Sequence, residues 1–160
     1  MPKLNTALLA AALTALALLA PSAHAQLASK KALTLDAAKR IAAAAEAEAM
    51  KNKWNVVIAV VDDGGHLLYL QRQDGTQTGS IEVAVGKART AMAFKRPTKV
   101  FDDLAKTRPS IVSLGTDAVL LEGGVPVAVD GQVIGAVGVS GVTSQQDAQI
   151  AEAGIAALER

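Results

Sequence analysis

The segment VVDDGGHLLYLQR, residues 60–72, places a histidine directly after a turn of two acids and two glycines. Once residues 1–25 are removed, as argued below, His66 is the one histidine left in the chain. A lone imidazole cannot build a two-histidine metal site, but it can ligate haem iron. The preceding glycines would let a ligand approach the backbone closely. His66 is therefore a candidate metal and cofactor ligand. The alternative is a histidine at a strand end, half in water.

The two acids of the same turn offer a second chemistry. Asp62 and Asp63, together with His66, supply the oxygen and nitrogen donors of a divalent-ion site. Aspartate followed by glycine is also what a tight hairpin turn prefers. The turn is the favoured interpretation, and the metal site is the alternative.

The sequence lacks the residues that several classes of enzyme require. The chain has no cysteine, which excludes thiolate metal sites, iron–sulfur clusters, cysteine nucleophiles and disulfides. No Gly-x-Ser-x-Gly, P-loop or His-Glu-x-x-His motif is present. The catalytic residues, if the protein is an enzyme, are therefore not identified by motif.

Two strands should position the histidine. The apolar run WNVVIAVVD, residues 54–62, predicts a central strand, and HLLYLQR, residues 66–72, predicts the returning one. Pairing through the DDGG turn sets His66 opposite Val61 and turns Tyr69 to the other face.

Helices should cover this hairpin and a second one. Helical patterns follow Thr34, span residues 80–96, occupy part of 98–107 and begin again after Thr143, where Gln146 completes a capping box. The second hairpin, residues 123–141, turns at Asp130-Gly131. Its glycines would accommodate either a ligand or partner subunit lying flat on the strand, or a closely packed helix. This order predicts an α+β fold with helices covering an antiparallel sheet.

The N-terminal segment is typical of an export signal. Lys3 precedes an uncharged apolar stretch over residues 7–20, and Ala23-His24-Ala25 fits a small-x-small cleavage site. The stretch is too short for a comfortable membrane span. We expect a signal peptide over residues 1–25 and a domain over residues 26–160, and hence a periplasmic or secreted protein.

Charge and composition limit the partners. Without Lys3, fifteen basic residues balance fifteen acidic ones, which argues against nucleic acid. One Trp, one Tyr and two Phe leave few rings for stacking on a flat ligand. The core must therefore consist of Ala, Val, Leu and Ile.

Five blocks in order resemble the GlcG/HbpS-like family, whose members include haem-degrading domains and the C-terminal domain of PduO. The blocks are LTLDAAKRIAAAAEAEA, VVIAVVDDGGHLLYLQRQDG, SIEVAVGKARTA, GGVPVAVDGQVIGAVGVSG and QQDAQIAEAGIAAL. The resemblance spans about residues 33–158. It implies a PAS- or profilin-like α+β domain with a five-stranded antiparallel sheet, a tendency to form homo-oligomers, and haem as the cofactor.

The same resemblance gives basic residues a role. Lys87 and Arg89, and with less support Lys95 and Arg96, become candidates for haem propionates, which arginine can bind in bidentate fashion. Their alternative is an ordinary solvated helix surface. Met50 and Met92 are possible thioether ligands, but methionines at helical spacing more often fill a core. We therefore expect His66, Lys87 and Arg89 to bind the cofactor and His66 to bind its metal.

The preferred function is an exported haem-binding protein, linked in some family members to haem breakdown or redox sensing. Whether this chain is an enzyme is left open. One alternative is a non-enzymatic module that binds another small molecule or a membrane sensor partner. The other is a metal-dependent enzyme of small organic acids built on Asp62, Asp63 and His66.

Overall fold

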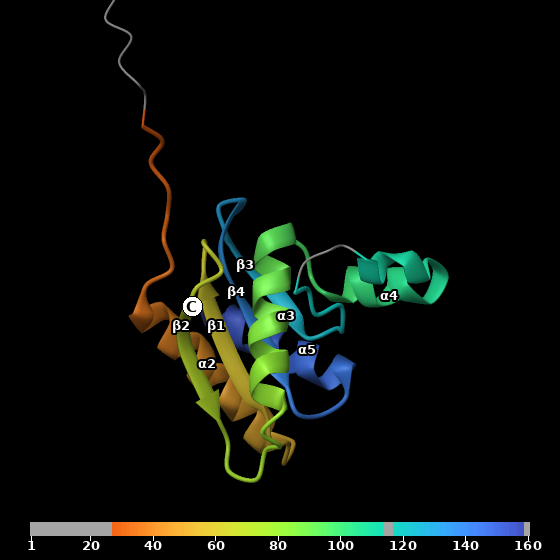
Figure 1. Ribbon diagram of the computed structural model, residues 1–160. Helices are drawn as coiled ribbons and strands as arrows, with labels where there is room; N and C mark the ends of the chain where they lie inside the picture. Colours follow the sequence, from red (N-terminus) through yellow and green to blue (C-terminus); the bar gives the residue numbers. More distant parts are fainter. Residues whose placement is uncertain (1–26, 114–116, 159–160) are drawn as a thin grey trace, which may run out of the picture. The chain divides into compact units, whose positions relative to one another are not determined.

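A computed structural model describes residues 27–113 and 117–158 (Figure 1). Lys31–Arg160 forms one compact unit, and residues 27–30 before it carry no helix or strand. The expected signal peptide lies outside the described residues. Within them, no helix is long and apolar enough to cross a membrane. The elements are α2 (Leu35–Lys51), β1 (Val57–Asp62), β2 (Leu67–Arg72), α3 (Ser80–Phe94), α4 (Lys99–Thr107), the 3-10 helix η1 (Pro109–Ser113), β3 (Gly124–Val129), β4 (Gln132–Ser140), α5 (Ser144–Ile155) and the 3-10 helix η2 (Ala156–Leu158).

The sheet is antiparallel throughout, in the order β2-β1-β4-β3. This confirms the α+β prediction of two hairpins covered by helices. The prediction of a fifth strand is wrong, because the sheet has four strands in the described residues. Between α3 and β3, the described residues 95–113 and 117–123 form α4, η1 and irregular segments, with no strand. The likeness to PAS and profilin folds stays a prediction.

Helices cover both faces of the sheet (Figure 1). α3 packs on one face and α2 and α5 pack on the other. Alternate residues of β1 serve the two layers, as a period of two requires. Val57, Ala59 and Val61 meet the α3 layer, while Ile58 and Val60 join the core with α2 and α5.

Small residues bring α3 very close to the sheet. A side-chain carbon at Gly138 in β4 would lie 2.0 Å from the carbonyl oxygen of Ala84 and 2.6 Å from the amide nitrogen of Ala88. No side chain fits there without moving the helix. At this glycine the structure therefore supports helix packing, one of the two uses considered for the second hairpin.

The predicted register of the first hairpin is off by one residue at Val61 and by two residues from Val57 to Val60, where Val60 pairs with Tyr69. Val61 pairs with Leu67, not with His66, and a bulge falls between Val60 and Val61. His66 therefore lies in the turn before β2 and outside the strand. A bulge inserts an extra residue, which the count through an ideal two-residue turn does not include.

We predict that Gly138→Ala destabilises the fold, because the added methyl group must displace the α3 backbone. Overpacking of this kind costs about 1–3 kcal/mol in the free energy of unfolding. Gly79→Ala is the matched control, since nothing lies within 4 Å of a carbon built at Gly79. Urea unfolding of both variants would check this. Equal stabilities would show that the packing is looser than described.

Candidate functional site: a cleft between the first hairpin turn and α3

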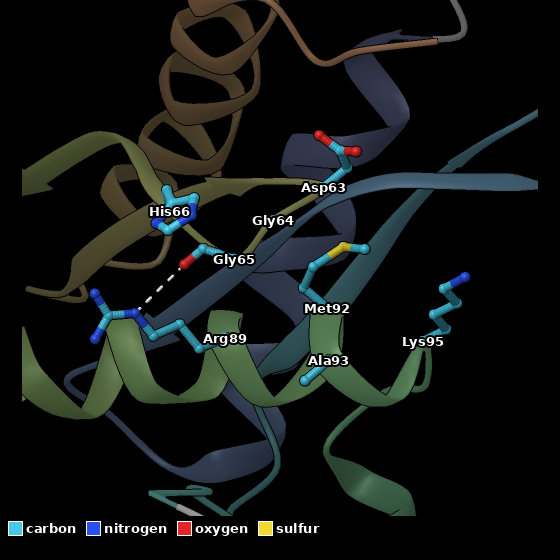
Figure 2. A pocket seen from close by; sticks show the side chains of 8 residues that line it. All are labelled: Asp63, Gly64, Gly65, His66, Arg89, Met92, Ala93 and Lys95. Carbon is cyan, nitrogen blue, oxygen red and sulfur yellow. Dashed lines mark hydrogen bonds between the residues drawn. The ribbon is translucent and has the colours of Figure 1, made fainter. Parts of the chain in front are cut away.

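A cleft of about 480 Å³ lies between the β1–β2 turn and α3 (Figure 2). Two elements supply its walls, and the side chains that they contribute differ in kind. The turn contributes Asp63, Gly64, Gly65 and His66, and α3 with its C-cap contributes Arg89, Met92, Ala93 and Lys95. The cleft thus combines an imidazole, two cations, one carboxylate and a small apolar floor.

The turn is organised by the carboxylate of Asp62. Its Oδ1 accepts hydrogen bonds from the amides of Gly64 at 2.9 Å and His66 at 2.8 Å. The amide of Asp62 in turn donates to the carbonyl of His66 at 2.9 Å. Gly65 has φ +79°, a conformation that favours glycine. The turn interpretation of DDGG is therefore confirmed.

No metal cluster forms from these acids. Among residues 27–113 and 117–158, no group of three or more His, Asp or Glu side chains is placed to hold a metal ion. Because Asp62 Oδ1 already accepts two amide hydrogen bonds, that oxygen is committed to the turn. The hypothesis of a divalent-ion enzyme on Asp62, Asp63 and His66 loses its structural basis.

The imidazole of His66 is exposed and lies against the turn. A side-chain carbon at Gly64 would sit 2.9 Å from Cδ2 and 3.3 Å from Nε2 of the ring. Because Gly64 has no side chain, the His66 ring can lie against it at the rim of the cleft. Figure 2 shows His66 above the backbone of Gly65, across from Arg89.

Arg89 joins the two walls. Its Nε donates to the carbonyl oxygen of Gly65 at 3.4 Å, while the side chain remains exposed. Lys95 is the C-cap of α3, has φ +52° and is also exposed. Two cations thus border the cleft at different points of α3.

Lys87 is not in the cleft, although it was a candidate together with Arg89. Residues two apart on a helix point to different faces. The Lys87 side chain is 2% exposed, and its ammonium donates to the carbonyl of Val139 at 3.0 Å and pairs with Asp147 at 2.8 Å. A carbon at Gly123 would lie 2.8 Å from this ammonium, so the backbone there covers it.

The other end of this pair is equally enclosed. Asp147 lies in the first turn of α5, is 2% exposed, and accepts from the amide of Val142 at 3.2 Å. Burial raises the pKa of Asp147, and hydrogen bonding and charge from Lys87 oppose that rise. Lys87 therefore ties α3 to α5, which fixes the helix that presents the cleft residues.

The two methionine candidates also lie in different environments, one buried and one exposed. Met92 is 6% exposed and belongs to the core under α3, as expected, yet it also lines the cleft. Met50 is 66% exposed, so the expectation that it fills the core is wrong. Ala93 was missed, although its position four residues after Arg89 places both on one helix face.

Comparisons with known proteins agree with this architecture. The family model described as "Haem degrading protein HbpS-like" matches residues 33–156. The GlcG protein of Escherichia coli K12 is 46% identical over 111 residues, which cover 69% of this chain and 83% of GlcG.

Two solved structures extend the comparison. A double mutant of Streptomyces reticuli HbpS superposes with a TM-score of 0.77 at 34% identity, covering 87% of this chain and 97% of that one. A haem complex of PduOC gives a TM-score of 0.72 at 30% identity, covering 79% and 95%. The fold and cleft therefore define an α+β domain of the HbpS-like class. The chain belongs to the HbpS-like haem-degrading protein family, together with GlcG.

We predict that Lys87→Met destabilises the protein and makes its stability depend on pH. Removing one partner of a buried pair costs about 3–5 kcal/mol. Without the ammonium, the pKa of Asp147 rises further above that of the unfolded chain. The folded state then prefers the protonated carboxyl, so stability falls as the pH rises from the unfolded pKa towards the folded one.

The double variant Lys87→Met/Asp147→Asn is the control, since it removes both charges and keeps an oxygen for the Val142 amide. Urea unfolding at several pH values between 4 and 8 measures the effect. The double variant should recover part of the stability and lose the added pH dependence. A single variant as stable as the wild type would contradict the structural role of the pair.

Proposed function

We propose that this chain is an exported haem-binding protein whose haem is held in the cleft between the first hairpin turn and α3. The observation that supports this best is the meeting of His66, Arg89 and Lys95 around one cleft in a chain of the HbpS-like family. The family model describes a haem degrading protein, and PduOC has been solved as a haem complex.

The residues of the cleft fit such a ligand. A volume of about 480 Å³ lies within the usual range of ligand pockets. The exposed imidazole of His66 would bind the haem iron, and Arg89 and Lys95 would balance the propionates. Gly64, Gly65 and Ala93 leave space for a flat ring. In this proposal Lys87 acts through the position of α3 and does not touch the ligand.

Bound haem would supply redox chemistry at its iron, and the protein would supply binding, orientation and charge. Haem breakdown and redox sensing are the activities proposed on this basis. The cleft is open, and a second copy of the chain covering it would exclude water, so we also propose a homo-oligomer. A membrane sensor is the proposed protein partner.

A non-enzymatic module for another small molecule is the second candidate. It is favoured by the lining of the cleft, in which no aromatic side chain is available to stack on a porphyrin. The titration below separates the two functions.

We predict that the purified chain binds haemin saturably, with a shifted Soret band. His66→Ala should move that band and weaken binding by about tenfold or more, because the axial nitrogen is lost. Arg89→Gln and Lys95→Gln should each weaken binding about two- to fivefold without moving the band, since exposed ion pairs contribute about 0.2–1 kcal/mol.

Lys39→Gln is the control for charge, because Lys39 is an exposed lysine of α2 that does not line the cleft. It should bind haemin like the wild type. No saturable Soret shift in the wild type would end the haem proposal. An unchanged band in His66→Ala would remove only His66 as the ligand.

Export has its own test. We predict that a bacterium with a periplasm secretes the chain there with Gln26 as the new N-terminus. Ala25→Arg should block cleavage, because signal peptidases require a small residue at this position. N-terminal sequencing of the periplasmic fraction checks the site. Retention of an uncleaved wild-type chain in the cytoplasm would contradict export.

A further inference from the structure

A second cavity, of about 460 Å³, lies against α3 and the segment 117–119. Its lining includes three residues of α3 that are spaced four and seven apart and so lie on one face of the helix, namely Glu82, Gly86 and Ala93. This stripe differs from the residues Ala84, Ala88 and Ala91, which are buried under α3. Nothing in the proposed haem site uses the second cavity, although Arg89 and Ala93 border both.

The wall formed by segment 117–119 is held in place by specific contacts. The amide of Val119 donates to Oγ1 of Thr90 at 2.9 Å, and that hydroxyl donates to the carbonyl of Gly86 at 2.8 Å. Gly86 provides the seat for the Val119 side chain, because an added carbon there would lie 2.3 Å from Val119 Cγ2. These contacts hold the Val119 end of the segment against α3.

One end of the cavity is apolar. Phe94 lines it and packs against Phe101 of α4 in a tilted arrangement, with ring centroids 4.9 Å apart. Ala93, Ala118 and Val119 extend this surface. A ligand here would gain from burying an apolar body, since burial stabilises by about 25 cal/mol per Å².

The charges of the cavity are unbalanced. Glu82 and Asp117 both line it, and neither forms an ion pair or hydrogen bond through its carboxylate within residues 27–113 and 117–158. Arg89 is the one cation of the lining, and its Nε bonds instead to Gly65. Two acids against one base leave a net negative charge beside an apolar surface. Such a site favours a cation.

We infer that this cavity binds a small organic cation, in which an ammonium group sits on an apolar or aromatic body. Glu82 and Asp117 balance the charge, and Phe94, Ala118 and Val119 contact the body. This inference does not require haem to be bound and uses no iron ligand, although the two cavities share Arg89 and Ala93.

The test uses 2-phenylethylamine as the probe, with the neutral 2-phenylethanol and the anionic 3-phenylpropanoate as matched controls. The full chain without added haem is titrated, and amide shifts are followed by NMR. We expect saturable shifts at Phe94, Ala118 and Val119 with a Kd of about 1 mM for the amine, as for a good fragment of this size. The alcohol should bind more weakly, and the anion should not bind.

Glu82→Gln and Asp117→Asn should each weaken amine binding about two- to fivefold, the effect of an exposed ion pair. The double variant should bind the amine no better than the alcohol. Both residues are exposed, so the fold should persist. Glu152→Gln, an exposed carboxylate of α5, is the control and should leave the Kd unchanged.

A steric variant keeps the test independent of charge. Ala118→Leu should fill the cavity and weaken binding of both the amine and the alcohol. The inference is overturned if the amine gives no saturable shifts, if the shifts map elsewhere, or if the double variant retains the preference for the amine. Loss of haem binding in a separate titration would leave this result untouched.

Discussion

Helix α3 lies so close to the sheet that a single methyl group at Gly138 would overlap the carbonyl oxygen of Ala84. This contact excludes any side chain at position 138 of β4 and fixes the distance between α3 and the strands. The position of α3 then decides the geometry of both cavities, because each takes part of its wall from the helix. Small side chains in the core are thus a condition for the site as well as for the fold.

The buried pair of Lys87 and Asp147 adds a constraint that packing of small residues does not provide. Alanine, valine and glycine contacts resist compression, but they specify the rotation of a helix about its axis only weakly. A charged pair enclosed between α3 and α5 does specify it, since an ammonium that rotated away would be left buried without its partner. The rotation of α3 matters because Lys87 and Arg89 are two residues apart and point to different sides of the helix. Lys87 points into the buried pair, and Arg89 lines the cleft. With Lys87 held inside, Arg89 must point to the cleft.

Local patterns in the sequence predicted much of the fold. Both hairpins, the helices around them and the capping box of Thr143 and Gln146 are present, because each depends on neighbouring residues. The features that sequence reasoning missed depend on irregular strand pairing or on distant partners. The bulge at Val60 and Val61 arises within the paired hairpin, and Lys87 meets an aspartate sixty residues further along the chain. No periodicity marks either event.

The same distinction applies to the cleft. His66 was identifiable because it was the only histidine of the expected mature chain, and Arg89 because its helix belonged to a family block. Nothing in the sequence separated Arg89 from Lys87, since both are cations of one helix. The second cavity was hidden altogether, because one wall comes from the segment 117–119, which had no clear pattern.

Arg89 gives the two cavities a physical connection. Its side chain borders both, and its Nε is held by the turn that carries His66. An anionic group bound in the first cleft would draw the guanidinium towards it and leave Glu82 and Asp117 less compensated, which strengthens attraction for a cation in the second. By linkage, a cation bound in the second cavity must favour the anion in the first by the same free energy. If both proposed ligands bind, the residue common to both walls couples their affinities, and the coupling free energy is the same whichever ligand binds first.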